Sequence, residues 1–74
     1  MPEPFNLRTT IAEPLQLVAN ELRPFAEKDQ VFANAYNSLC NVLDSFDQRL
    51  MTGTGKGLNK DWNKIPLIES QKNN

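Results

Sequence analysis

One spacing pattern decides most of what this chain can fold into. From Ile11 to Leu50, apolar residues recur at alternating steps of four and three, with an interruption at Asp29. The apolar members of this stripe are Ile11, Leu15, Val18, Leu22, Phe25, Phe32, Tyr36, Leu39, Leu43, Phe46 and Leu50. A half-buried strand would show strict alternation instead, so the spacing predicts α-helices that pack on other helices.

A second series of residues runs beside the stripe. A small side chain follows every other stripe position, at Ala12, Ala19, Ala26, Ala33 and Cys40. Small side chains on the flank of a helix let a neighbouring helix approach closely and widen the buried face. The two series together are specific for helix packing and say little about biochemical function.

The helical body is expected to span residues 10–51, after an N-terminal extension over residues 1–9. Thr10 and Glu13 have the spacing of a capping box, and Pro14 favours an alternative start at Glu13. At the other end, Gly53 suits the left-handed position that closes a helix. Helix is expected throughout residues 30–51, a length of roughly 33 Å.

The middle of the body leaves two architectures open. Pro24 and the polar run that follows it favour a break, which gives a two-helix hairpin with Asp29 capping the second helix. Against a break, the seven-residue register continues unchanged, and Pro24 could merely kink one long helix. The fold class is therefore all-α, with the hairpin as the first reading and the kinked helix as the alternative.

Both architectures point to a partner. A chain of 74 residues makes one small domain, and a single core of this size is marginal without a metal, disulfides or association. Cys40 is the only cysteine and histidine is absent, so neither an internal disulfide nor a zinc site is expected. In a hairpin with a short first helix, the stripe around Leu43, Phe46 and Leu50 would stay exposed. We therefore expect an oligomeric helical bundle or docking onto another protein.

The glycine-rich segment after the body raises the question of a nucleotide. A phosphate-binding loop needs glycine, four residues, then Gly-Lys-Ser/Thr, placed between a strand and a helix. Here Gly55 and Lys56 are followed by Gly57, and Leu50 stands where the earlier glycine is required. Residues 52–57 are predicted to be a flexible linker.

Residues 58–74 form a lysine-rich tail with an apolar anchor. The anchor residues are Trp62, Ile65, Leu67 and Ile68. Tryptophan and aliphatic side chains that fill pockets dominate interface energies, so the tail has the composition of a docking peptide. An equally weighted reading is that the tail folds back and covers the exposed half of the second helix.

Charge and hydropathy restrict the remaining function classes. Eight basic and nine acidic side chains give a net charge of −1, with acidic residues in the helical body and lysines in the tail. Such a body is a poor electrostatic match for nucleic acid. We also expect no targeting segment, no membrane span and a cytoplasmic location. Cys40 is expected to be a buried hydrophobe, and no nucleophile with a base, metal set or cofactor loop is found.

The sequence thus predicts a non-enzymatic interaction protein with no cofactor and no small-molecule substrate. It would act as an adaptor, regulator or inhibitor of a larger machine, with a structural subunit of a permanent assembly as the alternative. A weak nucleic-acid-binding helical dimer is a second alternative. The predicted interface residues are Leu15, Val18, Leu22, Phe32, Tyr36, Leu39, Leu43, Phe46 and Leu50. The pattern does not name the partner or separate a homo-oligomer from a hetero-complex.

Overall fold

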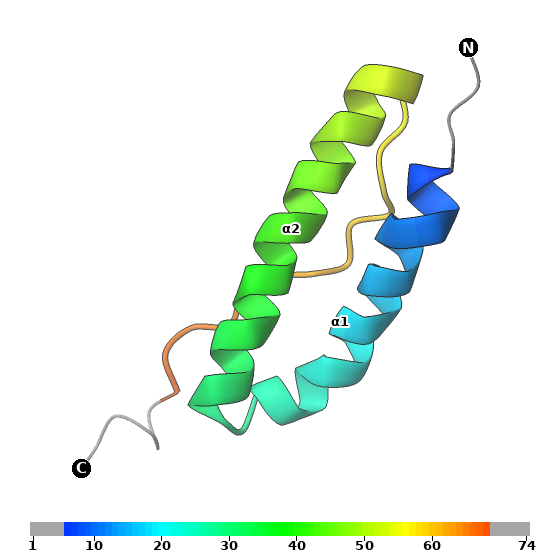
Figure 1. The fold of residues 1–74 in the computed structure, drawn as a ribbon. Coiled ribbons are helices and arrows are strands. Elements are labelled where there is room, and N and C mark those ends of the chain that lie inside the picture. The colour runs from blue at the N-terminus through cyan, green and yellow to red at the C-terminus, as the bar shows by residue number, and fades with distance from the viewer. Residues whose placement is uncertain (1–5, 69–74) are drawn as a thin grey trace.

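A computed structural model describes residues 6–68 and shows a two-helix hairpin (Figure 1). A short π-helical turn, η1 (Arg8–Ala12), leads into α1 (Glu13–Ala26), and α2 (Gln30–Thr54) returns antiparallel to it. The described residues contain no strand. The hairpin reading of the sequence is confirmed, and the single kinked helix is excluded.

The reversal between the helices takes place at Glu27–Asp29. The Phe25 carbonyl accepts the amides of Lys28 and Asp29, which closes α1. Asp29 then adopts extended geometry, and its side chain accepts the Val31 amide at 2.8 Å. A carboxylate in this position accepts a hydrogen bond from an amide that the first helical turn leaves unpaired. Asp29 is therefore the N-cap of α2, as predicted. Pro24 lies in the last turn of α1 and does not break it.

The start of the first helix differs from the prediction. The Asn6 side chain accepts the Thr9 amide at 3.3 Å, so Asn6 provides the capping that the sequence assigned to Thr10. The Glu13 amide then bonds to the Arg8 carbonyl, five residues back, in a widened π turn. This turn stands immediately before Pro14, whose ring would clash with a carbonyl in regular α geometry. The helical segment therefore begins near Leu7 and continues through Pro14.

The end of α2 also lies further along the chain than expected. The helix continues through Gly53 to Thr54, and Gly55 is the left-handed C-cap, with φ of 79°. The Gly55 amide bonds to the Met51 carbonyl, as in a helix-closing turn. The segment predicted as linker, residues 52–57, is therefore helical in its first half.

The small-residue series forms the contact between the helices. Its alanines have no exposed surface and Cys40 is 1 % exposed. These side chains let the helices approach, and Tyr36 and Leu43 fill the remaining space. The predicted exposure around Leu43 and Leu50 is wrong, because both side chains are buried. The reason is that η1 lengthens the first helical segment, so the hairpin closes over most of α2.

The seven-residue repeat continues in register across the turn, and equivalent positions of the repeat are buried in both helices. A shift of 21 residues along the sequence carries Ala12 to Ala33, Ala19 to Cys40 and Leu22 to Leu43. In each pair both side chains are buried, or one is buried and the other half-buried. The two helices therefore bury equivalent positions of the seven-residue repeat at these pairs.

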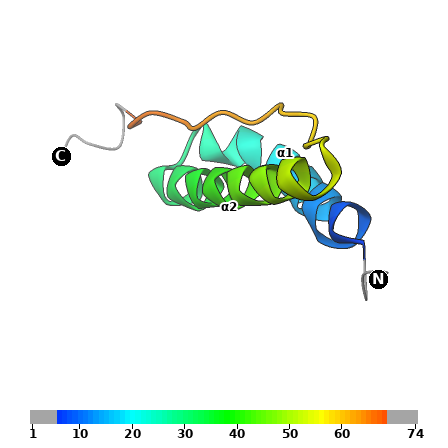
Figure 2. The same cartoon turned by 90° about the horizontal axis from the view of Figure 1, so that it is seen from above.

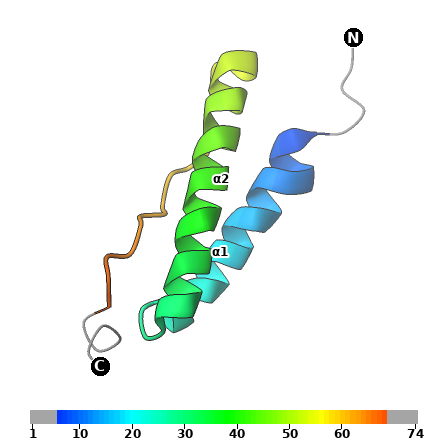
Figure 3. The ribbon, with the colours of Figure 1, turned by 60° about the vertical axis from the view of Figure 1, so that its left-hand side comes forward.

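The chain beyond Gly55 is extended and lies along one side of the two-helix layer (Figure 2). It runs beside α2 in the opposite direction (Figure 3). Residues 55–68 are called the tail segment below, and the side on which they lie is called the tail face. The opposite side, from which the tail segment is absent, is called the open face.

Candidate functional site

The tail segment is held by a row of polar side chains, which we call the clamp row. Its members are Gln16 and Arg23 on α1 and Gln30, Asn37 and Asp44 on α2, each seven residues from the next. Every one of them hydrogen-bonds to the tail segment. The carboxamide of Asn37 makes a double contact, accepting the Ile65 amide at 2.8 Å and donating to the Ile65 carbonyl at 2.9 Å. These bonds replace the partners that an extended backbone would find in a sheet.

Trp62 is the apolar anchor of the tail segment. Its side chain is 5 % exposed and belongs to the same core cluster as Tyr36 and Leu43. Its indole nitrogen donates to Asp44 at 2.8 Å, and Lys60 pairs with the same carboxylate at 3.3 Å. The hydrogen bond from Trp62 is the main reason that the pKa of Asp44 is lowered. Apolar burial and a charge-assisted hydrogen bond therefore fix the same residue.

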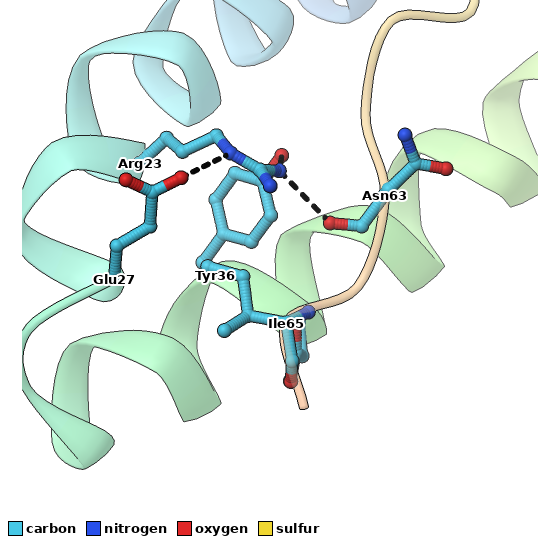
Figure 4. A network of polar contacts seen from close by, with 6 residues as sticks. Arg23, Glu27, Tyr36, Asn63 and Ile65 are labelled. Carbon is cyan, nitrogen blue, oxygen red and sulfur yellow. Dashed lines mark hydrogen bonds and ion pairs between the residues drawn. The ribbon is translucent and has the colours of Figure 1, made fainter. Parts of the chain in front are cut away.

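Arg23 joins both helices to the tail segment (Figure 4). Its guanidinium donates to the Tyr36 hydroxyl at 2.9 Å, to the Asn63 carbonyl at 3.1 Å and to Glu27 at 3.0 Å. The bond to Tyr36 is the largest cause of the raised pKa of Arg23, followed by the bond to Glu27. Arginine suits this position because its planar group presents several donors in fixed directions.

The first part of the tail segment is fixed to the N-terminal end of the hairpin. Arg8 donates to the carbonyls of Gly57 and Lys56 at 2.9 and 2.7 Å, and Asp47 accepts the Leu58 amide at 2.7 Å. A Cβ at Gly57 would collide with the Asp47 carboxylate where it now lies, so glycine permits this approach without moving that side chain. A polar groove of about 640 Å³ opens beside this crossing. The arginine that lines this groove, Arg8, already donates to two backbone carbonyl groups.

The open face carries a second row with the same period, which we call the heptad row. Its members are Ile11, Val18, Phe25, Phe32, Leu39 and Phe46, each seven residues from the next. None is fully buried, and the exposed fractions reach 51 % at Val18 and 59 % at Phe25. Apolar side chains in a regular row on a surface of this size mark a contact region.

The position of the heptad row follows from helix geometry. From Val18 to Phe46, each member stands two residues after a clamp-row residue, and two residues rotate a helix by about 200°. The heptad row therefore points away from the tail segment. It also precedes the small series by one residue, a rotation of about 100°, and it lies only about 40° from the buried position of Leu43. Its side chains therefore flank the contact between the helices.

The members of the heptad row stand in pairs across the two helices. The rings of Phe25 and Phe32 are 6.0 Å apart between centroids, next to the reversal. Seven residues back along α1 and seven forward along α2 each cover about 10.5 Å in the same direction. Regular helix geometry therefore puts Val18 level with Leu39 and Ile11 level with Phe46. We call this expected series of three pairs, of which the Phe25–Phe32 contact is shown, the ladder.

The structure divides the predicted interface residues into two groups. Tyr36, Leu43 and Leu50 are buried in the hairpin, whereas Leu15 and Leu22 are partly buried beside them. Leu39 is also partly buried against the core cluster, and Val18, Phe32 and Phe46 are the members that remain on the open face. Any role of these residues in binding stays a prediction.

The tail residues predicted to dock divide in a similar way. Trp62 is buried, Ile65 and Ile68 are half-buried against the core, and Leu67 is 59 % exposed. Of the two readings of the tail, the structure shows the fold-back. The last part of the predicted tail, residues 69–74, and residues 1–5 of the predicted extension lie outside the described residues.

The clamp row was missed in the sequence. The repetition of its amide and charged side chains every seven residues is visible in the sequence. The period alone does not reveal a clamp, because a polar row is what a solvent-facing helix surface also shows. Its meaning depends on where the tail segment returns.

Cys40 and possible metal ligands are the remaining candidates for chemistry within residues 6–68. Cys40 is buried, as predicted, and burial raises the pKa of its thiol. In the same range, no three histidine, cysteine or acidic side chains gather as metal ligands, and neither α1 nor α2 is long and apolar enough to cross a bilayer. Comparisons with protein-family models, curated proteins and solved structures gave no match.

Proposed function

We propose that the protein is a small non-enzymatic interaction module that binds other helices through the heptad row. It would serve as an adaptor, regulator or inhibitor of the protein that it binds. The observation that carries the proposal is the ladder of apolar pairs on the open face. The tail segment covers the other face of the same hairpin, so the two faces are not equivalent.

Heptad patterning supports this reading. A lone pair of helices needs a narrow apolar seam of about two residues in seven, whereas helices in a larger bundle use about three. In this hairpin the small series and the deep positions such as Leu22 and Leu43 already form the helix contact. The heptad row is a third apolar position, and its natural use is a further layer of helices.

Self-contained packing favours an adaptor over a permanent structural subunit. Trp62 and the clamp row close the core without a second chain. In the described part of the chain, every buried side-chain nitrogen or oxygen has a hydrogen-bond partner. A chain with these features should fold before it meets its partner.

The same packing argues against nucleic-acid binding. Stacking platforms for bases require exposed aromatic rings beside a basic groove. Trp62, the only tryptophan, is buried, and Lys60 is paired with Asp44. The rings exposed on the open face, Phe25 and Phe32, are followed along the heptad row by Val18 and Leu39 rather than by lysines.

The test is affinity capture from nuclease-treated lysate of the source cells with three tagged baits. These are the unaltered chain, Val18→Glu in the heptad row, and Leu17→Glu as the matched control, since Leu17 is 65 % exposed but points away from the ladder. We expect the unaltered and control baits to recover the same stoichiometric polypeptide, including untagged copies of this chain, and Val18→Glu to lose it. Equal recovery by all three baits would contradict the proposal.

A further inference from the structure

We infer that the tail face is a binding surface for extended polypeptide, and that it takes in trans a segment of a partner protein. The segment has the chemistry that the tail segment shows, which is a tryptophan followed by aliphatic residues at the third and sixth positions after it. The tail segment occupies this surface in cis and so competes with the partner. The inference is separate from the proposed function, because the heptad row takes no part in it.

The tail segment meets the hairpin through every third residue. Trp62 is buried, Ile65 and Ile68 are half-buried, and the residues between these three are exposed. A β-strand would bury every second residue, whereas an extended polyproline II helix has three residues per turn. Pro66 suits this conformation because its ring fixes φ. The contact pattern is that of a short extended ligand lying on a surface.

The spacing of the clamp row matches this period. Seven residues of α2 advance about 10.5 Å, and three residues of extended chain advance about 9–10 Å. Each step along the clamp row of α2 therefore meets every third residue of the tail segment. The bonded pairs are Asp44 with Trp62, Asn37 with Ile65, and Gln30 with Ile68.

Most of these contacts read the backbone of the tail segment rather than its side chains. The carboxamide of Asn37 bonds to both the amide and the carbonyl of Ile65. Gln16 and Arg23 on α1 donate to tail carbonyls, and Gln30 on α2 accepts a tail amide. Any extended segment offers the same groups. In the recognition of extended peptides, such main-chain bonds give affinity, and the sites of the side chains give specificity.

The side-chain sites select an aromatic and two aliphatic residues. Trp62 belongs to the same core cluster as Tyr36, and Asp44 accepts its indole N–H at 2.8 Å. Phenylalanine would leave the hydrogen bond to Asp44 unmade, so the first site prefers tryptophan. Ile65 and Ile68 pack against the same cluster. The selected pattern is one tryptophan and two aliphatic side chains at steps of three.

The tail segment can leave this surface without breaking a helix. Within residues 56–68, no backbone group bonds to the backbone of either helix. The bonds from Gln16 and Arg23 to the tail segment are exposed, and those from Asn37 and Gln30 are only partly buried. Segments held by bonds that water reaches open locally at a lower free energy than the core does.

A second copy of the chain is a poor source of the entering segment. Its tail segment already lies on its own tail face, so an exchange between two copies gains no contact and loses the freedom of two chains. A partner segment that is free before it binds gives up no such contacts. The entering segment is therefore assigned to a different protein, which competes with a tail segment present at high effective concentration.

Peptide binding to full-length Trp62→Ala tests the inference, because this variant weakens the competing tail segment. The variant has no tryptophan, so the tryptophan of an added peptide is the only one present. The anchor peptide keeps a tryptophan and two isoleucines at the spacing of Trp62, Ile65 and Ile68, and every other residue is alanine, serine or lysine. We expect saturable binding with a blue-shifted emission. A fluorescein-labelled form should bind the unaltered chain at least about 10-fold more weakly, because its tail segment competes.

A second peptide of the same composition is the matched control. It places the isoleucines at the second and fourth positions after the tryptophan, the period of a β-strand, and should bind at least about 10-fold more weakly. On the protein side, Asn37→Ala added to Trp62→Ala should weaken binding of the anchor peptide, whereas Asn41→Ala, on the exposed surface, should not. Val18→Glu in the same background should leave the affinity unchanged, so failure of this inference and failure of the proposed function are separate results.

Trp62→Phe is measured in parallel, because it also lacks tryptophan and keeps an apolar side chain in the core. Circular dichroism should show helices in both variants, or in Trp62→Ala once the anchor peptide is added. Equal binding of the two peptides, or binding of neither peptide to either variant, would overturn the inference. A dimer of the unaltered chain that the anchor peptide dissociates would show that the entering segment comes from a second copy, and would overturn its assignment to a partner protein.

Discussion

The tail face and the open face of the hairpin have the same period and opposite chemistry. The clamp row places amide and charged groups every seven residues, and the heptad row places an apolar side chain two residues after each member from Gln16 to Asp44. On the tail face the polar groups are satisfied by the chain's own backbone. On the open face Val18 and Phe25 remain more than half exposed. The comparison teaches that the chain's own tail segment occupies one face, and it supports the proposal that the other face serves for binding.

The largest expected effect is on the tail face. Trp62→Ala removes the largest buried side chain of the tail segment and should cost about 3 kcal/mol or more, lowering the unfolding midpoint by roughly 12 °C or more. Leu67→Ala in the same segment is the control, because Leu67 is mostly exposed. Thermal unfolding followed by circular dichroism measures both. Equal midpoints for the two variants would show that the tail segment does not stabilise the hairpin.

A somewhat smaller effect on stability is expected at the contact between α1 and α2. Ala19→Leu would force the helices apart, because Ala19 has no exposed surface, and should destabilise by about 1–3 kcal/mol. Ala35→Leu places the same side chain on an exposed site of α2 and should change stability little. Chemical unfolding gives both free energies. A neutral Ala19→Leu would mean that the helices are further apart than the structure shows.

The clamp row should contribute less per residue. Asn37→Ala leaves the amide and carbonyl of Ile65 without their side-chain partner and should cost about 1–2 kcal/mol. Asn41→Ala, on the exposed surface of the same helix, serves as the control. The fluorescence of Trp62 should also report partial release of the tail segment in Asn37→Ala. An unchanged free energy of unfolding would show that water satisfies the backbone groups of Ile65 as well as the Asn37 side chain does.

The smallest effect is a pH dependence at Asp44. Its pKa is lowered in the folded chain, mainly by the hydrogen bond from Trp62, so ionised Asp44 stabilises the fold. This stabilisation is complete above about pH 4 and is lost as the pH falls through the lowered folded pKa. Because Asp44 is nearly half exposed, the change should be small. Trp62 fluorescence between about pH 5 and 2 should change less in Asp44→Asn than in the unaltered chain.

Much of the fold could be predicted from residue spacing. The four-and-three pattern identified the helices, Asp29 identified the N-cap of α2, and the small series identified a close helix contact. The capping signals at the ends of the helices were less informative. Thr10 and Gly53 had suitable chemistry for capping, but Asn6 and Gly55 perform it, because Pro14 is tolerated after a π turn and α2 continues for one more half-turn.

The candidate site was only partly visible in the sequence. The predicted stripe contains both the buried positions, such as Leu43, and the heptad row, such as Val18, because they differ by only 40° around a helix. Separating them required knowing which side the partner helix occupies. The clamp row could not be recognised either. Its hydrogen bonds join residues far apart in the sequence, such as Asn37 and Ile65, which are 28 residues apart.

The division of roles between the two faces is tested most directly by the unfolding midpoints of Asn37→Ala and Val18→Glu, read from Trp62 fluorescence. Asn37 holds the tail segment, whereas Val18 is exposed on the open face. We expect a lower midpoint in Asn37→Ala and an unchanged midpoint with an intact Trp62 signal in Val18→Glu. A midpoint that falls as much in Val18→Glu as in Asn37→Ala would contradict the account.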